Sequence, residues 1–406
     1  MKNLIIFLTT LLFFSSCQEN PDPYVPAIDF KSDKKASQLI AADNEFAFKL
    51  FKEIHNLAEE DNYMVSPLSV SIALGMTYNG SDGATKTAFE ETLGFTGFTR
   101  HEINVVHGLL IEHLLKVDPK VTFEIANSIW VDQKFTLQSE FADSNAYYYD
   151  AEINSLDFLS PESVDIINNW ISDKTHEKIT EVLDEIPAEA VMYLINALYF
   201  YGSWQYEFDK EQSAPMNFTY DDGSTDQVDG MAMTTSLPLA FNDKFTAIEL
   251  PYGDNKFSMM IMLPKNNYNI DDVIGDMNSD WWETWTGDLV ETNITLQMPK
   301  FKYEFKTLLN DHLKNMGLGV AFGRGAEFPL MVEEPLDLFI SRVIHKTFID
   351  VNEEGTEAAA VTVVEMNLTS VGDGSIAINI DRPFIYVIRE KTSGALVFMG
   401  KVGRPG

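Results

Sequence analysis

The sequence contains a single cysteine, Cys17, among its 406 residues. One cysteine rules out an intrachain disulfide. It also excludes thiol catalysis and a cysteine-rich zinc site. Hydrophobic residues make up 45% of the chain, a value typical of globular proteins, so a large noncovalent core is expected to stabilise the fold.

Basic residues are scarce. The chain has 29 lysines and arginines against 62 acidic residues, which gives a formal net charge of −33. Such a surface repels nucleic acid and anionic lipid headgroups. We therefore expect no nucleic-acid partner and no heparin-type cofactor.

Enzymatic motifs are missing as well. The sequence has no G-x-S-x-G, no H-E-x-x-H and no G-x-x-x-x-G-K-[ST]. His107 and His113, with Glu112 between them, do not have the spacing that places two imidazoles on one helical face, so surface positions are predicted rather than a metal site. We expect no enzyme, metal or cofactor. A hydrolase with dispersed carboxylates stays open, because residue counts do not exclude it.

The N-terminus has the pattern of an export signal. Lys2 precedes an apolar run from Leu4 to Phe14, and small residues lead up to Cys17. This arrangement resembles a bacterial lipobox and predicts a lipoprotein signal peptide over 1–16, with lipidation at Cys17. An ordinary signal peptide with an incidental cysteine is the alternative. We expect an exported protein, lipid-anchored to the cell envelope or surface or otherwise secreted, with a flexible tether over 17–42.

The remainder, 43–406, shows no second linker and no repeat, which indicates a single domain. Ser66 is placed to cap a helix that starts at Pro67. The helical spacing of apolar residues predicts a first helix that buries Leu39, Phe46, Leu50, Ile54 and Leu57.

Runs of strands and runs of helices favour the α+β class over alternating βαβ units. Ala190–Trp204 is predicted as a central strand buried on both faces. Two C-terminal strands, PFIYVIRE and GALVFMGKV, are predicted to form a hairpin. Other predicted strands are VTFEIANSIWVD, FTAIELPYG, FSMMIMLPK and ITLQMPKFKYEF, and further helices are predicted at Asp165–Lys178 and Leu308–Met316.

The segment Asn352–Ser370 reads NEEGTEAAAVTVVEMNLTS and contains no proline, lysine or arginine. Gly355 belongs to a turn, and the residues from Thr356 onward alternate like a strand with one uncharged face. A plain edge strand would usually carry lysine or proline. Three consecutive alanines pack weakly, and small side chains lose little entropy when they move into a gap. The segment could therefore lie either outside the fold as an exposed loop or within a sheet as a strand.

Motifs along the chain resemble those of the serpins, the suicide-type serine protease inhibitors. The segments that carry the resemblance are NYMVSPLSVSIALGM, NNWISDKTHEKITEVL, LINALYFYGSW, HKTFIDVNEEGTEAAAVT and DRPFIYVIREKTSGALVFMGKVGRP. They stand in family order from about Asp43 to Arg404. The resemblance implies an α+β fold with three β-sheets, about eight or nine helices and a reactive-centre loop near 353–375.

The resemblance also implies a mechanism. A protease attacks the loop as a substrate, and the cleaved loop inserts into the main sheet before the acyl-enzyme is hydrolysed. The implied hinge comprises Glu353, Glu354, Gly355, Thr356, Glu357, Ala358, Ala359 and Ala360. The implied polar shutter, the place where the sheet must open, comprises Ser66, Ser69, Asn196 and His345. Trp204 and Lys300 are implied to lie at the end of the sheet where insertion begins.

The family's usual loop length places the scissile bond at Thr369–Ser370, with Leu368–Thr369 and Met366–Asn367 as fallback bonds. No lysine or arginine lies between Gly355 and Asp381, so a trypsin-like target is not expected. An elastase- or subtilisin-like protease is the expected target, and a chymotrypsin- or cathepsin-like one is the fallback.

We expect the protein to be a monomer. A non-inhibitory binding protein of the same fold, cleaved as a substrate, is the alternative.

Overall fold

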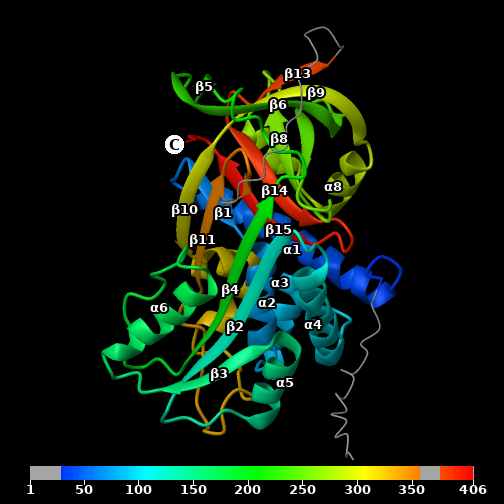
Figure 1. Ribbon diagram of the computed structural model, residues 1–406. Helices are drawn as coiled ribbons and strands as arrows, with labels where there is room; N and C mark the ends of the chain where they lie inside the picture. The colour runs from blue at the N-terminus through cyan, green and yellow to red at the C-terminus, as the bar shows by residue number, and fades with distance from the viewer. Residues whose placement is uncertain (1–28, 357–374, 406) are drawn as a thin grey trace, which may run out of the picture.

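A computed structural model describes residues 29–356 and 375–405, which form helices packed against two groups of strands (Figure 1). The α-helices in these residues are α1 (Lys34–Leu57), α2 (Pro67–Tyr78), α3 (Gly83–Leu93), α4 (Arg100–Lys116), α5 (Ser139–Tyr149), α6 (Glu162–Lys174), α7 (Ile270–Asp276), α8 (Ser279–Thr286) and α9 (Asn310–Leu313). Two short helical turns, Lys314–Leu318 and Gly319–Phe322, follow α9. The predicted α+β class is confirmed.

Fifteen strands in the described residues make up the two groups. They are β1 (Asn62–Val65), β2 (Val121–Asp132), β3 (Ala151–Leu156), β4 (Met192–Ser203), β5 (Pro215–Thr219), β6 (Thr225–Phe241), β7 (Phe245–Pro251), β8 (Phe257–Pro264), β9 (Val290–Pro299), β10 (Phe301–Leu308), β11 (Ile344–Val351), β12 (Gly355–Thr356), β13 (Ile376–Asn379), β14 (Phe384–Glu390) and β15 (Leu396–Val402).

The larger group has the order β1-β15-β14-β8-β7-β6-β9-β13, with β5 paired to β6. The long strand β6 pairs first with β5, then with β9, and with β7 only through its last three residues. Strand β6 therefore belongs to two sheets within the larger group. Together with the six-stranded sheet of the second group they make three sheets, the number that was predicted. The second group has the order β10-β11-β12-β4-β2-β3. Within the part of the chain that the structure describes, its two central long strands, β4 and β11, are linked only through the two residues of β12.

The main core lies between the sheets and includes the buried faces of α1 and α2. A smaller apolar cluster fills the space between α6 and the outer face of the six-stranded sheet. Its buried members are Trp130, Phe158, Ile167, Ile171, Ile179, Leu183 and Ala197. Helices on both faces therefore enclose the six-stranded sheet.

Helix α1 starts earlier than the sequence pattern indicated. Asp33 caps it by accepting hydrogen bonds from the backbone nitrogens of Lys35 and Ala36. Residues 34–42 of the predicted tether therefore belong to the helix, because Ala36 and neighbouring apolar side chains are buried against the core. Of the predicted buried positions, only Leu57 is exposed, at the last turn.

Two further expectations are corrected. The segment ITLQMPKFKYEF forms two strands in different sheets, because Pro299 has no N–H to donate and the Lys300 nitrogen donates to Asp229 O (2.8 Å). Strand β4 is only half-buried over residues 192–196, since no strand of the described residues lies between it and β11 there.

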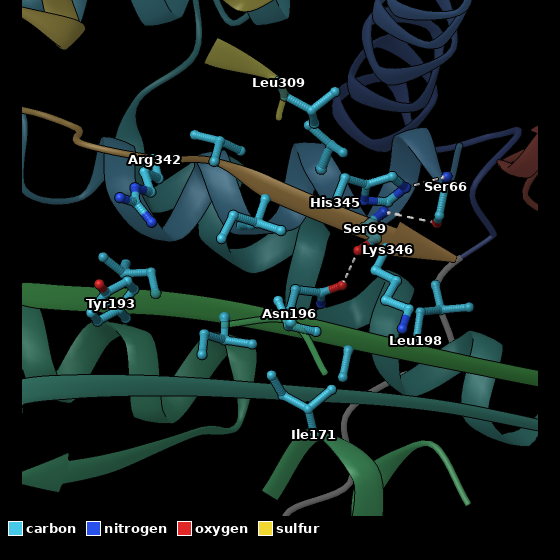
Figure 2. Close-up of a pocket in the computed structure, with 18 of the residues that line it drawn as sticks. Ser66, Ser69, Ile171, Tyr193, Asn196, Leu198, Leu309, Arg342, His345 and Lys346 are labelled. Carbon is cyan, nitrogen blue, oxygen red and sulfur yellow. Dashed lines mark hydrogen bonds between the residues drawn. The ribbon is translucent and has the colours of Figure 1, made fainter. Parts of the chain in front are cut away.

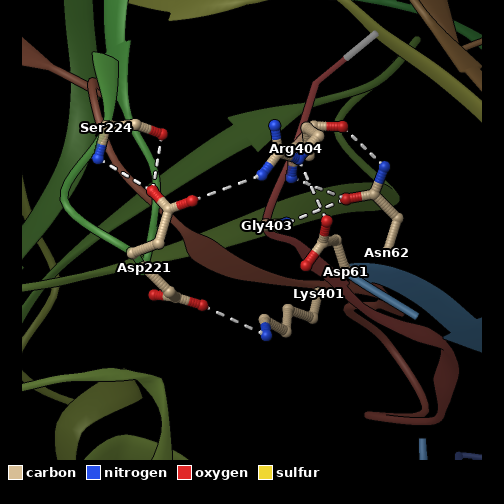
Figure 3. Close-up of polar contacts among 8 residues, drawn as sticks. Asp61, Asn62, Asp221, Ser224, Lys401, Gly403 and Arg404 are labelled. Carbon is tan, nitrogen blue, oxygen red and sulfur yellow. Dashed lines mark hydrogen bonds and ion pairs between the residues drawn. The ribbon is translucent and has the colours of Figure 1, made fainter. Parts of the chain in front are cut away.

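The C-terminal strand β15 lies inside the larger group, between β14 and β1. Its last residue, Val402, pairs with Asn62 of β1. Beyond the strand, Asn62 Nδ2 donates to Arg404 O (2.7 Å) and the Arg404 guanidinium contacts Asp61 (3.0 Å), as Figure 3 shows. Lys401 reaches Asp221 in the β5–β6 turn (3.4 Å). The segment around the end of β15 is thus fixed to the start of β1 and to the β5–β6 turn.

Candidate functional site

A cavity of about 400 Å³ lies between β4 and β11, below the two residues of β12. In Figure 2, Tyr193, Asn196 and Leu198 of β4 form one wall, and His345 and Lys346 of β11 form the other. Neither strand pairs with the other within the described residues, so their facing edges offer backbone donors and acceptors to a further strand.

The first two residues of such a strand are already in place. Gly355 pairs with Ser203 of β4, while Thr356 pairs with Gly202 of β4 and Val351 of β11. A side chain at position 355 would put its Cβ 2.8 Å from the Ser203 Cα, closer than packing allows. Only glycine therefore fits this close approach to β4.

Thr356 is buried and its hydroxyl lies 2.6 Å from the Tyr252 hydroxyl. The Trp204 ring stacks on Tyr252, with centroids 4.4 Å apart, and its Nε1 donates to Asn352 O (2.9 Å). Tyr252 and Trp204 thus line the end of the strand position that Thr356 occupies. Trp204 was predicted from its motif, whereas Tyr252 was predicted only as a residue near the end of the strand FTAIELPYG.

Charged side chains hold the first two residues of the hinge, Glu353 and Glu354. Lys300 Nζ lies 3.4 Å from the Glu353 carboxylate, which also accepts a hydrogen bond from Ser213 Oγ (2.7 Å). Burial opposes ionisation of Glu353, but the bonds from Ser213 and Lys300 outweigh it and keep its pKa below the ordinary value. Lys210 forms an ion pair with Glu354. Sequence reasoning identified Lys300 and Glu353, but neither Ser213 nor Lys210.

The four predicted shutter residues come together beside the cavity, as Figure 2 shows. Ser66 N donates to His345 Nε2 (3.0 Å), and Ser66 Oγ donates to Val397 O (2.9 Å). Ser69 Oγ donates to Asn196 Oδ1. The N-terminus of α2 is thereby connected to both walls of the cavity.

His345 must be neutral to accept this hydrogen bond, and burial lowers its pKa to about 4. In the unfolded chain its pKa returns to the ordinary value of 6.5. Between pH 6.5 and 4 only the unfolded state binds the proton, so native stability is expected to fall as the pH falls through this window. The loss is at most about 3 kcal/mol. Urea unfolding at pH 7.5 and 4.5 measures it.

His345→Gln provides the control, since an amide keeps an acceptor at this site but does not titrate. The variant is expected to lose less stability between the two pH values than the wild type. Equal losses in both proteins would contradict a role for His345.

The remaining predicted site residues, Cys17, Glu357–Ala360 and Met366–Ser370, lie outside the described residues. In 29–356 and 375–405, no three His, Cys, Asp or Glu side chains are grouped so that they could hold a metal ion. The same residues include no helix that is long and apolar enough to cross a membrane.

The comparisons with known proteins agree with this geometry. Residues 41–405 match the family described as Serpin (serine protease inhibitor). The chain is 35% identical to an uncharacterized serpin-like protein of Methanosarcina acetivorans, over 100% of this chain and 96% of that protein. It is 30% identical to intracellular coagulation inhibitor 2 of Tachypleus tridentatus, over 92% of each.

Among solved structures, the crystal structure of the thermophilic serpin Tengpin in the native state is similar, with a TM-score of 0.84 and 31% identity. The similarity covers 92% of this chain and 95% of that one. The family is generally one of protease inhibitors rather than enzymes. With a match over nearly the whole chain and the same fold, this protein belongs to the serpin family.

Proposed function

We propose that the protein is a suicide-type inhibitor of serine endopeptidases of elastase- or subtilisin-like specificity. The observation that carries the proposal is the strand position between β4 and β11, of which the described residues fill only the end, with Gly355 and Thr356. A segment that continues from Thr356 could complete the sheet by forming backbone hydrogen bonds on both of its edges.

The chemistry comes from the protease. Its serine Oγ attacks the carbonyl carbon of Thr369, an ester forms, and the amine of Ser370 leaves. Cleavage frees the segment after Thr356 to enter the cavity and to carry the esterified protease along. Distortion of the protease active site then prevents water from hydrolysing the ester. The inhibitor contributes no catalytic group.

The register of β12 fits this step. Thr356 pairs with Gly202 and Val351, and both pairings are antiparallel. Six residues further along, the same register would place Thr362 between Asn196 and His345. A hydroxyl would then enter the polar shutter, while Ala358 and Ala360 would fill the narrow space before it. The small residues of the hinge thus suit the position that they would occupy.

Specificity follows from the residues around the cleaved bond. No cation lies between Gly355 and Asp381 to fill a trypsin-like pocket. Thr369 after Leu368 suits a shallow pocket, whereas cleavage after Leu368 would suit a chymotrypsin- or cathepsin-like protease.

Incubation with elastase, subtilisin, chymotrypsin and trypsin, followed by denaturing gels, tests the proposal. We expect an adduct that survives SDS with elastase or subtilisin and none with trypsin. The mass of the released C-terminal peptide identifies the cleaved bond. Clean cleavage with no adduct from any protease would indicate a non-inhibitory serpin.

Export and lipid anchoring at Cys17 form part of the proposal, because Lys2, the apolar run and the small residues before Cys17 match a lipoprotein signal. The inhibitor would then act at the cell envelope or surface as a monomer. Metabolic labelling with a radioactive fatty acid, lost in Cys17→Ala, would test the anchor.

A further inference from the structure

A buried polar pair lies between α1 and α4, where the sequence had predicted a surface histidine. His107 is fully buried and its Nε2 lies 3.3 Å from Asp43 Oδ2. Ser71 Oγ of α2 donates to the other oxygen of Asp43 (2.6 Å). The surface prediction was wrong for His107 because its partner stands 64 residues earlier in the chain. His113 is partly exposed and contacts Glu390 (3.2 Å).

Tyr149, the last residue of α5, connects this pair to the six-stranded sheet. Its hydroxyl lies 3.2 Å from His107 Nδ1 and donates to Asn104 Oδ1 (3.0 Å). Its backbone carbonyl accepts a hydrogen bond from Asn127 Nδ2 of β2 (2.6 Å). One residue therefore contacts the buried pair through its side chain and the sheet through its backbone.

From Asn127 the chain of hydrogen bonds continues to the cavity. Asn196 Nδ2 of β4 donates to Asn127 Oδ1 (2.7 Å), and Asn196 Oδ1 accepts from Ser69 Oγ of α2. Asn196 lines the cavity between β4 and β11. Both ends of its amide are occupied, so its orientation depends on Asn127 on one side and Ser69 on the other.

Contacts on both sides hold the His107 ring. Its Nδ1 lies beside the Tyr149 hydroxyl and its Nε2 beside Asp43. A Cβ on Gly75 of α2 would lie 2.9 Å from the Tyr149 hydroxyl, so only glycine fits where α2 packs against this hydroxyl.

We propose that the buried Asp43–His107 pair positions Asn196 at the cavity, acting through Tyr149 and Asn127. In this arrangement the helices α1, α4 and α5 hold the β4 wall in the geometry that receives the loop. The inference rests on the proposed function, because the cavity is the place where the loop would insert. Tyr149 is a positioning residue and touches neither the loop nor a protease.

Tyr149→Phe removes the connecting hydroxyl with little change in volume. Tyr78→Phe is the matched control, since Tyr78 is equally buried and its hydroxyl donates to Glu90 (2.8 Å), outside this chain of bonds. Hydrogen–deuterium exchange of the purified protein is measured over residues 192–200 of β4. We expect about tenfold faster exchange in Tyr149→Phe and no comparable change in Tyr78→Phe. Asp43→Asn, which removes the charge, is expected to act like Tyr149→Phe.

A double-mutant cycle with Ser69→Ala separates positioning from general loosening. If Tyr149 acts on β4 through Asn196, the two substitutions disturb the same contact and their effects should not add. The double variant Tyr149→Phe/Ser69→Ala should then exchange clearly more slowly over β4 than the sum of the two single effects predicts. Additive effects, or equal effects of Tyr149→Phe and Tyr78→Phe, would overturn the inference. Exchange is measured without a protease, so the result decides this inference even if no adduct forms with the wild type.

Discussion

Thr356→Arg is expected to turn the inhibitor into a substrate of the same protease. Thr356 is 3% exposed and its hydroxyl contacts Tyr252 in the strand position between β4 and β11. An arginine there would leave a cation buried and unpaired, which costs about 3 kcal/mol or more. The intact protein avoids this cost when the two residues of β12 leave the strand position, whereas insertion has to bury the cation. Insertion therefore slows about 100-fold, while hydrolysis of the acyl-enzyme keeps its rate.

The measurement is the stoichiometry of inhibition, the number of inhibitor molecules consumed for each protease molecule trapped. We expect the ratio of inhibitor cleaved to inhibitor trapped, which is this stoichiometry minus one, to rise about 100-fold in Thr356→Arg while the rate of loop cleavage stays the same. Thr356→Ser is the matched control, because it keeps the hydroxyl that contacts Tyr252 and should inhibit like the wild type. Full inhibition by Thr356→Arg would contradict insertion through this position.

Cleavage of the loop by a catalytic amount of protease is expected to raise the unfolding temperature by about 20 °C. The inserted segment would bury side chains such as Val364 and Met366, each worth about 1.5–3 kcal/mol, and would add backbone hydrogen bonds to two strands. A gain of about 15 kcal/mol corresponds to about 20 °C for a domain of this size.

Differential scanning calorimetry before and after cleavage measures this change. Cleaved Thr356→Arg serves as the control: its loop is cut, but its insertion is hindered, so its unfolding temperature should rise much less. Superimposable curves for the intact and cleaved wild type would mean that the cavity does not receive the loop.

Local chemistry made several elements predictable. Ser66 caps α2 and Pro67 occupies its first turn, because a hydroxyl acceptor and a residue without N–H suit those positions. Strand β2 has the predicted bounds, Val121–Asp132. Ser66, Ser69, Asn196 and His345 meet beside the cavity, as the family motifs implied.

Contacts between distant residues were not predictable in the same way. Tyr252 contacts Thr356 across 104 residues, and its neighbourhood in the sequence indicated only the end of a strand. The burial of His107 depends on Asp43, and Ser213 reaches Glu353 over 140 residues. The half-buried state of β4 depends on what fills the neighbouring strand position, which no pattern within β4 specifies.

The pairing of β1 with β15 sets an order on the synthesis and folding of this protein. β1 is made early, whereas its partner β15 follows every other described strand of the sheet in the sequence. A chain whose synthesis has not reached Val402 leaves one edge of β1 without its native partner. The sheet can therefore be completed only after all of its other described strands have been made, and a premature stop before β15 should leave β1 unpaired and yield no native protein.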